Sequence, residues 1–385
     1  MTVTDSPIDA AAQRDALGER IFEQLLVSTE LLTVDLGLRT GLYHALSELG
    51  TANPAELAGA AGVHPRYARE WLEQQAVAGY VQVATHSDDD AERRYLLPPG
   101  HAEALLDPDS PGYVGAASPN LVGLAGVIRE VSAAYRAGTG VPYSDYGEDI
   151  RHGIGGFNRP MFVNDLAATW MAAVPDLHAK LVAAPAPRIL DVGSGTGWST
   201  IALARAYPRA TVVGLDMDEA SVTEARQAAH QAGVSDRVEF VRADAADTGL
   251  DGTFDLITIF EALHDMAHPV VVLEHLRSLL ADGASIIVGD ERVAESFAAP
   301  GDEIERFMYM WSVLHCLPAT MAEGPSVDAG TVLRADTVRS YGALAGFGAV
   351  EELAIENDFW RFYRISSDRS ADRRPGRRNC SGGRT

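Results

Sequence analysis

The sequence predicts an α/β fold in which a doubly wound, mostly parallel sheet follows a smaller, mainly helical domain. An apolar run at residues 189–192, interrupted only by Asp191, leads directly into three glycines spaced two apart. Such a run is typical of a buried parallel strand, and a glycine turn before a helix opens a nucleotide-like site at the carboxyl edge of a sheet. Further apolar runs alternate with helical patterns, at residues 210–215, 238–241, 254–260 and 284–289.

Length, composition and charge limit the class of protein. The chain has 385 residues, 46% of them apolar, which is enough for two cores. Its formal net charge of -23 disfavours nucleic acid and anionic membranes, because both would repel it. Two cysteines are too few for a disulfide framework, and neither a signal peptide nor a membrane-spanning run is present in the sequence. We therefore expect a cytoplasmic protein with no nucleic acid and no membrane among its partners.

The pattern along the chain predicts five parts. Residues 1–14 and 366–385 lack apolar periodicity and are expected to be disordered. Residues 15–111 form a mainly helical domain, and residues 112–180 form a helical linker punctuated by glycine and proline. Residues 181–365 contain the sheet.

The mainly helical domain has the pattern of a winged helix. Three helices and two short strands are expected, at residues 16–49, 54–61, 66–78, 79–83 and 94–97. The direct interpretation of a winged helix is DNA binding through its second helix. Residues 51–100, however, hold four arginines and no lysine against seven acidic residues, and this charge would repel phosphate.

The spacing of the glycine turn indicates its ligand. A dinucleotide site requires Gly or Ala where this chain has Trp198, so the large indole argues against a pyrophosphate on the helix start. The pattern D-x-G-x-G-x-G that begins at Asp191 resembles motif I of the class I S-adenosylmethionine-dependent methyltransferases. In that family the bare turn lets backbone amides meet the methionyl carboxylate of the cofactor. The resemblance implies that the cofactor is bound by Asp191, Gly193, Ser194, Gly195 and Gly197.

Acidic residues follow the next two strands at matching places. Asp216 ends the second strand, where a carboxylate can accept hydrogen bonds from both ribose hydroxyls. Asp244 follows the third strand, where an acid of the resembling family receives the adenine amino group. By the same resemblance Met217 and Ala245 contact the adenine ring, and Phe260, at the end of the fourth strand, belongs to the same site. The implied cofactor is S-adenosylmethionine.

The C-terminal elements extend the resemblance. A helix at residues 336–345 precedes an antiparallel hairpin at 350–355 and 359–365, which resembles the end of the seven-stranded methyltransferase sheet. The winged helix resembles the N-terminal dimerisation domain of small-molecule O-methyltransferases. The resemblance therefore implies a homodimer, and an active site roofed by residues 112–180.

A histidine follows the fourth strand, where the acceptor would meet the methyl group. Leu263-His264-Asp265 resembles the Leu-His-Asp-Trp segment of plant and bacterial O-methyltransferases, whose histidine is the general base, although Met266 replaces the Trp. His264 and Asp265 are thus the candidate catalytic residues, because an imidazole can accept a phenol's proton near neutral pH. Three acids remain open as the carboxylate that orients the histidine, namely Asp290, Glu291 and Glu323.

An aromatic and Met-rich insertion follows the fifth strand, at residues 291–334. It suits an apolar acceptor pocket, and equally suits lid or core packing. No set of His, Cys or acidic residues has the spacing of a metal site, so no metal is expected.

Together these observations predict a dimeric methyltransferase that transfers a methyl group from S-adenosylmethionine to a small, aromatic or polyketide-like acceptor, at oxygen. The same cofactor site would serve transfer to carbon or nitrogen, with His264 as a spectator. The alternative from another class is a winged-helix regulator that senses the cofactor and binds DNA.

Overall fold

The computed structural model describes residues 9–324, 330 and 332–367, and it divides into two compact units. The first unit comprises the chain up to Gly126 together with Glu148–Pro160, and the second comprises Val127–Gly147 and the chain from Met161. The predicted helical linker at 112–180 is therefore shared between the units. The expected disorder of residues 1–8 and 368–385 lies outside the described residues.

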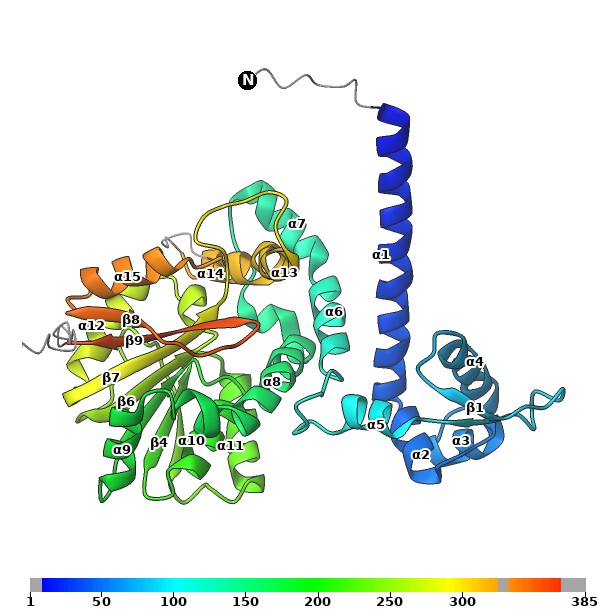
Figure 1. Ribbon diagram of the computed structural model, residues 1–385, viewed down its shortest axis with the longest axis horizontal. Coiled ribbons are helices and arrows are strands. Elements are labelled where there is room, and N and C mark those ends of the chain that lie inside the picture. Colours follow the sequence, from blue (N-terminus) through cyan, green and yellow to red (C-terminus); the bar gives the residue numbers. More distant parts are fainter. Residues whose placement is uncertain (1–8, 325–329, 331, 368–385) are drawn as a thin grey trace, which may run out of the picture. The chain divides into compact units, whose positions relative to one another are not determined.

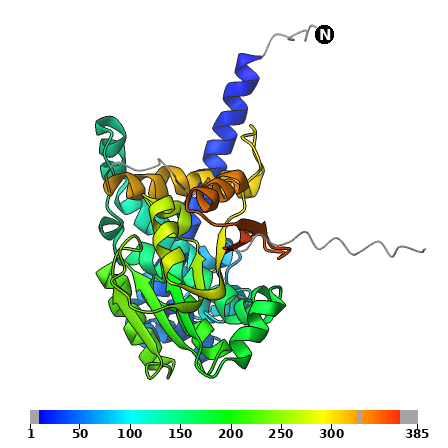
Figure 2. The same cartoon turned by 90° about the vertical axis from the view of Figure 1, so that its left-hand side faces the viewer.

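The first unit is built around the predicted winged helix. Its long helix is a single unbroken element in both views (Figures 1 and 2). The elements are α1 (Ala10–Arg39), α2 (Leu42–Leu49), α3 (Pro54–Ala61), α4 (Pro65–Val77), β1 (Gln82–Thr85), β2 (Arg94–Leu96), α5 (Pro99–Leu106) and α6 (Ala117–Gly126). The two strands pair antiparallel, with Val83 opposite Tyr95. The expected helices and hairpin are present, except that the helical stretch at 16–49 is divided at Thr40 and Gly41 into α1 and α2.

Local sequence signals explain where these helices begin. Asn53 caps α3 in a capping box, since its side chain accepts from the N–H of Glu56, whose carboxylate accepts from the N–H of Asn53. Asp9 caps α1 by accepting from the N–H of Ala11. Because of this cap α1 begins at Ala10, so the expectation of disorder up to residue 14 is wrong for its last five residues.

The second unit contains the predicted sheet of seven strands. Its strands are β3 (Arg188–Val192), β4 (Thr211–Asp216), β5 (Val238–Arg242), β6 (Phe254–Phe260), β7 (Leu280–Glu291), β8 (Ala349–Glu352) and β9 (Trp360–Ser366). They lie in the order β5-β4-β3-β6-β7-β9-β8, and β9 pairs antiparallel with both of its neighbours. The strand order reverses between β3 and β6, which places a ligand site at the carboxyl ends of these two strands.

Helices cover both faces of this sheet (Figure 1). One face packs against α9 (Pro175–Ala183), α10 (Trp198–Ala206), α11 (Glu219–Gln231) and the π-helical turn η2 (Leu166–Trp170). The other face packs against α12 (Pro269–Ser278) and α15 (Ala335–Leu344). Each face has its own apolar core, as a doubly wound fold requires.

The remaining segments of the second unit lie outside the sheet and its covering helices. They are α7 (Ile128–Ala137), η1 (Tyr143–Tyr146), the 3-10 turn η3 (Leu263–Asp265), α13 (Glu303–Trp311), the π-helical turn η4 (Ser312–Cys316) and α14 (Leu317–Ala322); α8 (Gly147–Asn164) begins and ends in this unit but lies largely in the first. Among the helices of the described part of the chain, none has the length and apolarity that crossing a membrane requires.

Candidate functional site

The turn after β3 requires glycine at two positions and leaves space at a third. Gly193, Gly195 and Gly197 have positive φ values of 72°, 49° and 89°. A Cβ on Gly193 would lie 2.4 Å from the Cβ of Ala262, and one on Gly197 would lie 2.7 Å from the Phe240 ring. A Cβ on Gly195 would meet no protein atom within 4 Å. The middle of the turn therefore leaves room for a ligand beside its backbone.

Asp216 holds the glycine turn through both carboxylate oxygens. Oδ2 accepts from the N–H of Gly195 at 2.8 Å, and Oδ1 accepts from the N–H of Asp218 at 2.9 Å. Burial raises the pKa of Asp216 to about 6, although these two hydrogen bonds favour the charged form. A carboxylate has lone pairs for further donors, so Asp216 can still receive the ribose hydroxyls of the expected cofactor.

Ser194 supplies an unsatisfied polar atom in the same turn. Its side chain is buried, and its Oγ has no hydrogen-bond partner among the described residues. Buried hydroxyls almost always have a partner, so a polar group of a ligand fits here. The open space at Gly195, the Ser194 hydroxyl and the Asp216 carboxylate together fit the amino-acid and ribose parts of S-adenosylmethionine.

Asp191 is engaged with the protein. It is buried, and its Oδ2 accepts from the hydroxyls of Ser199 and Thr200, both at 2.6 Å. Its Oδ1 accepts from the hydroxyl of Thr258 at 2.7 Å. Burial raises the pKa of Asp191, while these three hydroxyls act in the opposite direction. The contacts join β3 to α10 and β6 and support a structural role; direct contact of Asp191 with the cofactor stays a prediction.

The three residues predicted to surround adenine lie at the ends of β4 and β5. Met217 is half exposed, and Asp244 is exposed, with its Oδ1 accepting from the N–H of Ala246 at 2.8 Å. Ala245 is buried in the core on the α12 face. Met217 and Asp244 are thus accessible to a ligand, and their contacts with adenine stay predictions.

Phe260 is part of an aromatic cluster at the end of β6. Its ring centroid lies 5.7 Å from Phe162, 5.6 Å from Trp170 and 6.2 Å from Trp360, and it stacks on the last of these. These contacts place it in the core on the α10 face. The structure therefore gives Phe260 a packing role, and its predicted cofactor contact remains untested.

His264 is held between two carboxylates. It lies in η3, directly after β6, and its side chain is 2% exposed. Its Nδ1 lies 2.9 Å from Oδ1 of Asp290 on β7, whose side chain is 1% exposed. Its Nε2 lies 3.3 Å from Oδ1 of Asp265. Because Asp290 holds the ring from the Nδ1 side, a proton from a substrate could be taken only by Nε2, the nitrogen that faces Asp265.

Opposing effects set the protonation state of His264. Burial disfavours the imidazolium, but the charges of Asp265 and Asp290, with hydrogen bonds to Asp290 and Cys316, outweigh it. The pKa of His264 is therefore raised well above its usual value. His264 can accept a proton only after losing its own, which happens at higher pH or when another positive charge lies beside it.

A third acid, Glu291, lies near this histidine, and Glu261 lies near Glu291. Glu291 ends β7, and burial together with the charges of Glu261 and Asp290 raises its pKa well above the usual range. Its Oε2 has no hydrogen-bond partner among the described residues. Glu261 has a φ of 50°, the only positive φ outside glycine in the described part of the chain. This conformation costs about 1 kcal/mol or more and turns the chain from β6 into η3.

The glycine turn and the histidine turn touch each other. β3 and β6 are paired parallel neighbours, so their carboxyl ends meet at one edge of the sheet. The close approach of Gly193 to Ala262, two positions before His264, is the contact between them. The predicted cofactor turn and the predicted base therefore share one site.

Three potential metal ligands also meet here. One ligand atom each from His264, Asp265 and Cys316 lies within 4.8 Å of the others. Sequence spacing misses this group, because Cys316 comes from the distant insertion. Asp265 and Asp290 already face the ring of His264, whose protonated form supplies a positive charge here without an ion. That the protein needs no metal stays a prediction.

The sequence predicts several residues of this site but not their contacts. Of the three acids left open as partners of His264, the structure gives the Nδ1 contact to Asp290. Cys316 and its neighbour His315 belong to the aromatic insertion, where apolar packing is the only signal. Their position beside His264 arises from η4 and has no local signature.

Two segments of the chain match known families. Residues 28–106 match the family described as an Rv2258c-like winged HTH domain, and residues 184–327 match the family described as a methyltransferase domain. The chain carries a class I methyltransferase domain. This domain spans the glycine turn, Asp216 and His264. Its cofactor is S-adenosylmethionine, which the sequence predicts and which is present in a solved structure of the same fold.

Curated relatives of the methyltransferase domain match over part of their length. The 27-O-demethylrifamycin SV methyltransferase of Amycolatopsis mediterranei is 29% identical over 182 residues, which is 46% of this chain and 64% of that protein. The demethylmenaquinone methyltransferase of Clavibacter sepedonicus is 40% identical over 102 residues, which is 26% of this chain and 40% of that protein. Each match spans less than two thirds of the relative.

Solved structures match over nearly the whole chain. The mitomycin 7-O-methyltransferase MmcR has a TM-score of 0.65 at 19% identity, covering 93% of this chain and 99% of that one. Human N-acetylserotonin methyltransferase, in complex with SAM, has a TM-score of 0.65 at 16% identity, covering 96% and 100%. These likenesses confirm the predicted fold of both the winged-helix and the methyltransferase domain.

Proposed function

We propose that this protein transfers the methyl group of S-adenosylmethionine to a hydroxyl of a small aromatic or polyketide-like acceptor, with His264 as the general base. The single observation that carries the proposal is the buried His264–Asp290 pair beside the glycine turn. A base at the carboxyl edge of the sheet, next to the cofactor, is what transfer to a hydroxyl requires.

Different residues of the chain bind the cofactor, orient the base and accept the proton. When bound, S-adenosylmethionine supplies an electrophilic methyl group on a positively charged sulfonium. Ser194, the backbone at Gly195 and Asp216 hold the cofactor. Asp290 orients the His264 ring, and Nε2 of His264 takes the proton from the acceptor hydroxyl. His264 gives up its own proton more readily when a second positive charge is near, because like charges lower the pKa of an imidazolium.

The acceptor class is inferred from the insertion and from the relatives. The helical segment of the insertion brings His315 against Tyr143 of η1 and against its own Trp311, and such a group of rings suits an aromatic ligand. The relatives and neighbours include methyltransferases named for rifamycin, mitomycin and N-acetylserotonin. Both observations support a small-molecule acceptor; transfer to carbon or nitrogen is the alternative outcome of the experiment below.

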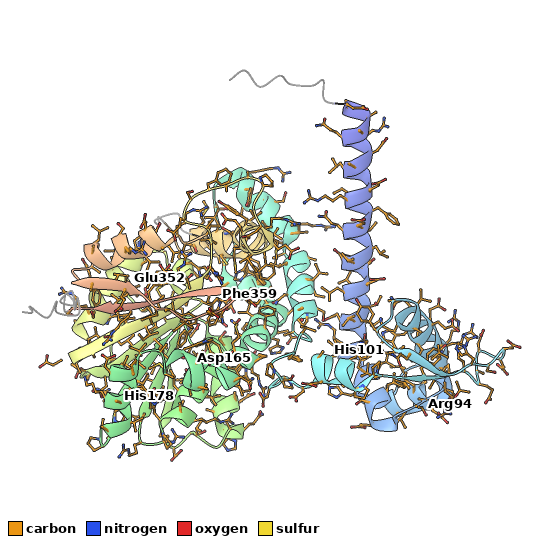
Figure 3. The ribbon with its side chains drawn as sticks, viewed as in Figure 1. Arg94, His101, Asp165, His178, Glu352 and Phe359 are labelled. Carbon is orange, nitrogen blue, oxygen red and sulfur yellow. The ribbon has the colours of Figure 1, made fainter. Side chains whose placement is uncertain are left out.

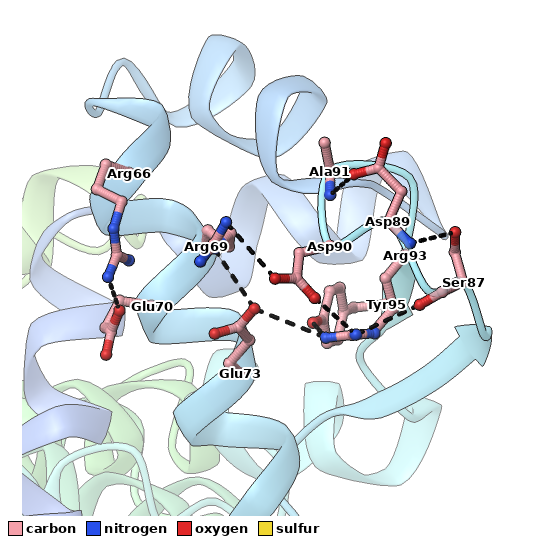
Figure 4. Close-up of polar contacts among 10 residues, drawn as sticks. All are labelled: Arg66, Arg69, Glu70, Glu73, Ser87, Asp89, Asp90, Ala91, Arg93 and Tyr95. Carbon is pink, nitrogen blue, oxygen red and sulfur yellow. Dashed lines mark hydrogen bonds and ion pairs between the residues drawn. The ribbon is translucent and has the colours of Figure 1, made fainter.

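A DNA-binding regulator is disfavoured by the charges on the winged helix. Arg69 on α4 faces Glu73 at 3.5 Å and Asp90 of the wing at 3.7 Å. Arg93 lies 2.8 Å from Asp90 and 3.6 Å from Glu73, and Arg66 pairs with Glu70 (Figure 4). Arg94, the fourth arginine of this segment, lies 2.8 Å from Glu56. Arginines already paired with carboxylates offer little attraction to phosphate, so we infer that DNA is not a partner.

The exposed side of α1 supports a homodimer. Eight large apolar side chains on this helix are 43% to 67% exposed, namely Leu17, Ile21, Phe22, Leu25, Leu26, Val27, Leu32 and Leu36. Exposed apolar surface of this extent is characteristic of an association site. We propose that two copies of the chain associate through α1 and that the protein works in the cytoplasm.

A panel of acceptors tests the proposed function. The protein is incubated with methyl-labelled S-adenosylmethionine and separate phenols, amines and carbon acids, and cofactor binding is measured by calorimetry with S-adenosylhomocysteine. We expect binding of S-adenosylhomocysteine and label transfer to phenols. Absence of binding would contradict the methyltransferase function, and label on amines or carbon acids alone would contradict transfer to oxygen.

A further inference from the structure

The insertion carries a π-helical turn that is anchored on several sides. η4 connects α13 to α14 without a break, and such turns change the direction in which side chains point. The carbonyls of Val313 and Leu314 accept from the hydroxyls of Tyr135 and Tyr146, at 3.0 and 2.9 Å. Thr320 donates to the carbonyl of Asp265 at 3.3 Å. The turn is therefore fixed to the segment that holds the catalytic pair.

This turn buries a second histidine. His315 is 1% exposed, and its ring makes edge contacts with Tyr146, Tyr143 and Trp311 at centroid distances of 4.6, 5.6 and 5.7 Å. Its Nδ1 lies 3.5 Å from Sγ of Cys316. Burial lowers the pKa of His315 to about 4, so the ring is neutral at pH 7.

The other nitrogen of this ring has no partner. Nε2 of His315 is buried and makes no hydrogen bond within the described part of the chain. If Nδ1 donates its proton to the sulfur of Cys316, Nε2 carries no proton and is an acceptor. If the thiol donates to Nδ1, Nε2 carries the proton and is a donor. Either form needs a partner, because a buried polar atom without one is destabilising. Packing against aromatic rings alone would be served as well by phenylalanine.

The ring that carries this nitrogen lies near the catalytic group. The sulfur of Cys316 is 3.5 Å from Nδ1 of His315 and within 4.8 Å of a ring nitrogen of His264, so both imidazoles lie near one thiol. Oδ1 of Asp265 lies 3.3 Å from Nε2 of His264 and pairs with that ring. The His315 ring, with its unpartnered Nε2, therefore lies on the Cys316 side of the proposed base.

We propose that His315 forms a second polar subsite for the acceptor, in which its Nε2 hydrogen-bonds an oxygen adjacent to the hydroxyl that faces His264. This inference rests on the proposed function and deepens it. The preferred acceptors are aromatic compounds with two neighbouring oxygens, such as catechols. His264 acts on one oxygen, and His315 positions the other.

Two chromophoric phenols test the subsite without turnover. Binding of 4-nitrocatechol and of 4-nitrophenol is measured from their absorbance changes, with the protein saturated with S-adenosylhomocysteine. His315→Leu removes the nitrogen, and His315→Gln keeps a hydrogen-bonding amide. His178→Leu is the matched control, because His178 is a half-buried histidine on α9 (Figure 3). Its Nδ1 lies 2.9 Å from the hydroxyl of Tyr207.

We expect His315→Leu to weaken the binding of 4-nitrocatechol about tenfold and that of 4-nitrophenol much less. The reason is that only the diol loses a hydrogen bond to His315. His315→Gln should restore most of the difference, and His178→Leu should change neither. Equal weakening of both phenols, or no weakening, would overturn the subsite. So would a lack of saturable 4-nitrocatechol binding by wild-type protein that binds S-adenosylhomocysteine. Failure to bind S-adenosylhomocysteine would instead contradict the proposed function itself.

Discussion

Nδ1 of His264 lies 2.9 Å from Oδ1 of Asp290, and both side chains are buried. Although burial opposes it, the charges of Asp265 and Asp290 raise the pKa of His264 well above its usual value, so the ring keeps its proton to a higher pH than a free imidazole does. A base that must first lose its proton gives a rate that rises with pH. The pH at which this rate rises should therefore depend on the charge of Asp290.

Replacing Asp290 with Asn should shift the pH profile of the reaction. The amide can still accept from Nδ1 but lacks the negative charge, so the pKa of His264 falls and the acidic limb of kcat/KM moves to lower pH. The profile is measured with the phenol that wild type methylates best. Asp282→Asn, an exposed position on the same strand, is the control and should leave the limb in place. If the acidic limb of kcat/KM did not move in Asp290→Asn, the charge of Asp290 would have no role in the mechanism.

Replacing His264 with Gln should lower kcat by about 10² to 10⁴, the usual contribution of a general base. The loss should be smaller for 4-nitrophenol than for phenol, because the more acidic compound ionises without help. Affinity for S-adenosylhomocysteine, measured by calorimetry, should stay the same. His268→Gln, at the N-cap of α12, controls for loss of a nearby histidine. Full turnover of phenol by His264→Gln at neutral pH would show that this residue is not the base.

Cofactor affinity should depend on the charge of Asp216. Its pKa is about 6, so below that pH the carboxyl gains a proton and loses acceptors for the ribose hydroxyls. We expect the affinity for S-adenosylhomocysteine to fall by up to about tenfold per pH unit below pH 6. Calorimetry at several pH values measures this. Asp216→Asn should bind weakly with little pH dependence, whereas Asp236→Asn, an exposed acid before β5, should behave like wild type.

The elements of the site whose signals are local could be predicted from the sequence. The glycines at 193, 195 and 197 predict a turn with left-handed backbone, and the apolar runs predict the strands around it. Asp216 is the last residue of β4 and His264 comes four residues after the end of β6, so the parallel sheet brings them to one edge. The sequence could not reveal which partners these residues have.

Contacts between distant segments explain what sequence reasoning missed. Asp191 belongs to the predicted motif, yet its oxygens are engaged by hydroxyls of α10 and β6. Phe260 faces the aromatic core rather than an open edge. Cys316, which contacts His315, lies within 4.8 Å of a ligand atom of His264, and both residues belong to the π-helical turn η4, which no local pattern encodes.

Burial of His315 should make folding sensitive to acid. Its folded pKa of about 4 lies below the unfolded value near 6.5, so the unfolded state binds the proton first and stability falls as the pH drops through this window. Between pH 7.5 and pH 5 this histidine costs about 2 kcal/mol of unfolding free energy. Urea unfolding should show that His315→Gln loses less stability over this interval than wild type does. His178→Leu controls for the removal of one histidine. Equal acid losses in wild type and His315→Gln would mean that His315 is not held neutral.

The apolar side of α1 should control the oligomeric state. Phe22 and Leu25 are 67% and 60% exposed, and burying each against a second copy would stabilise a dimer by about 1.5 to 3 kcal/mol. Light scattering should give a dimer mass for wild type and a monomer mass for the Phe22→Glu, Leu25→Glu double variant, because paired glutamates would repel and could not be buried. Val77→Glu, at a 91% exposed position on α4, should keep the dimer.

Two outcomes would contradict association through α1. A wild-type monomer at micromolar concentration would contradict the homodimer. A dimer that survives the Phe22→Glu, Leu25→Glu change would place the interface elsewhere. If the monomeric variant still bound S-adenosylhomocysteine like wild type, the cofactor site would be complete within one chain, as expected when the glycine turn, Asp216 and His264 all lie in the second unit.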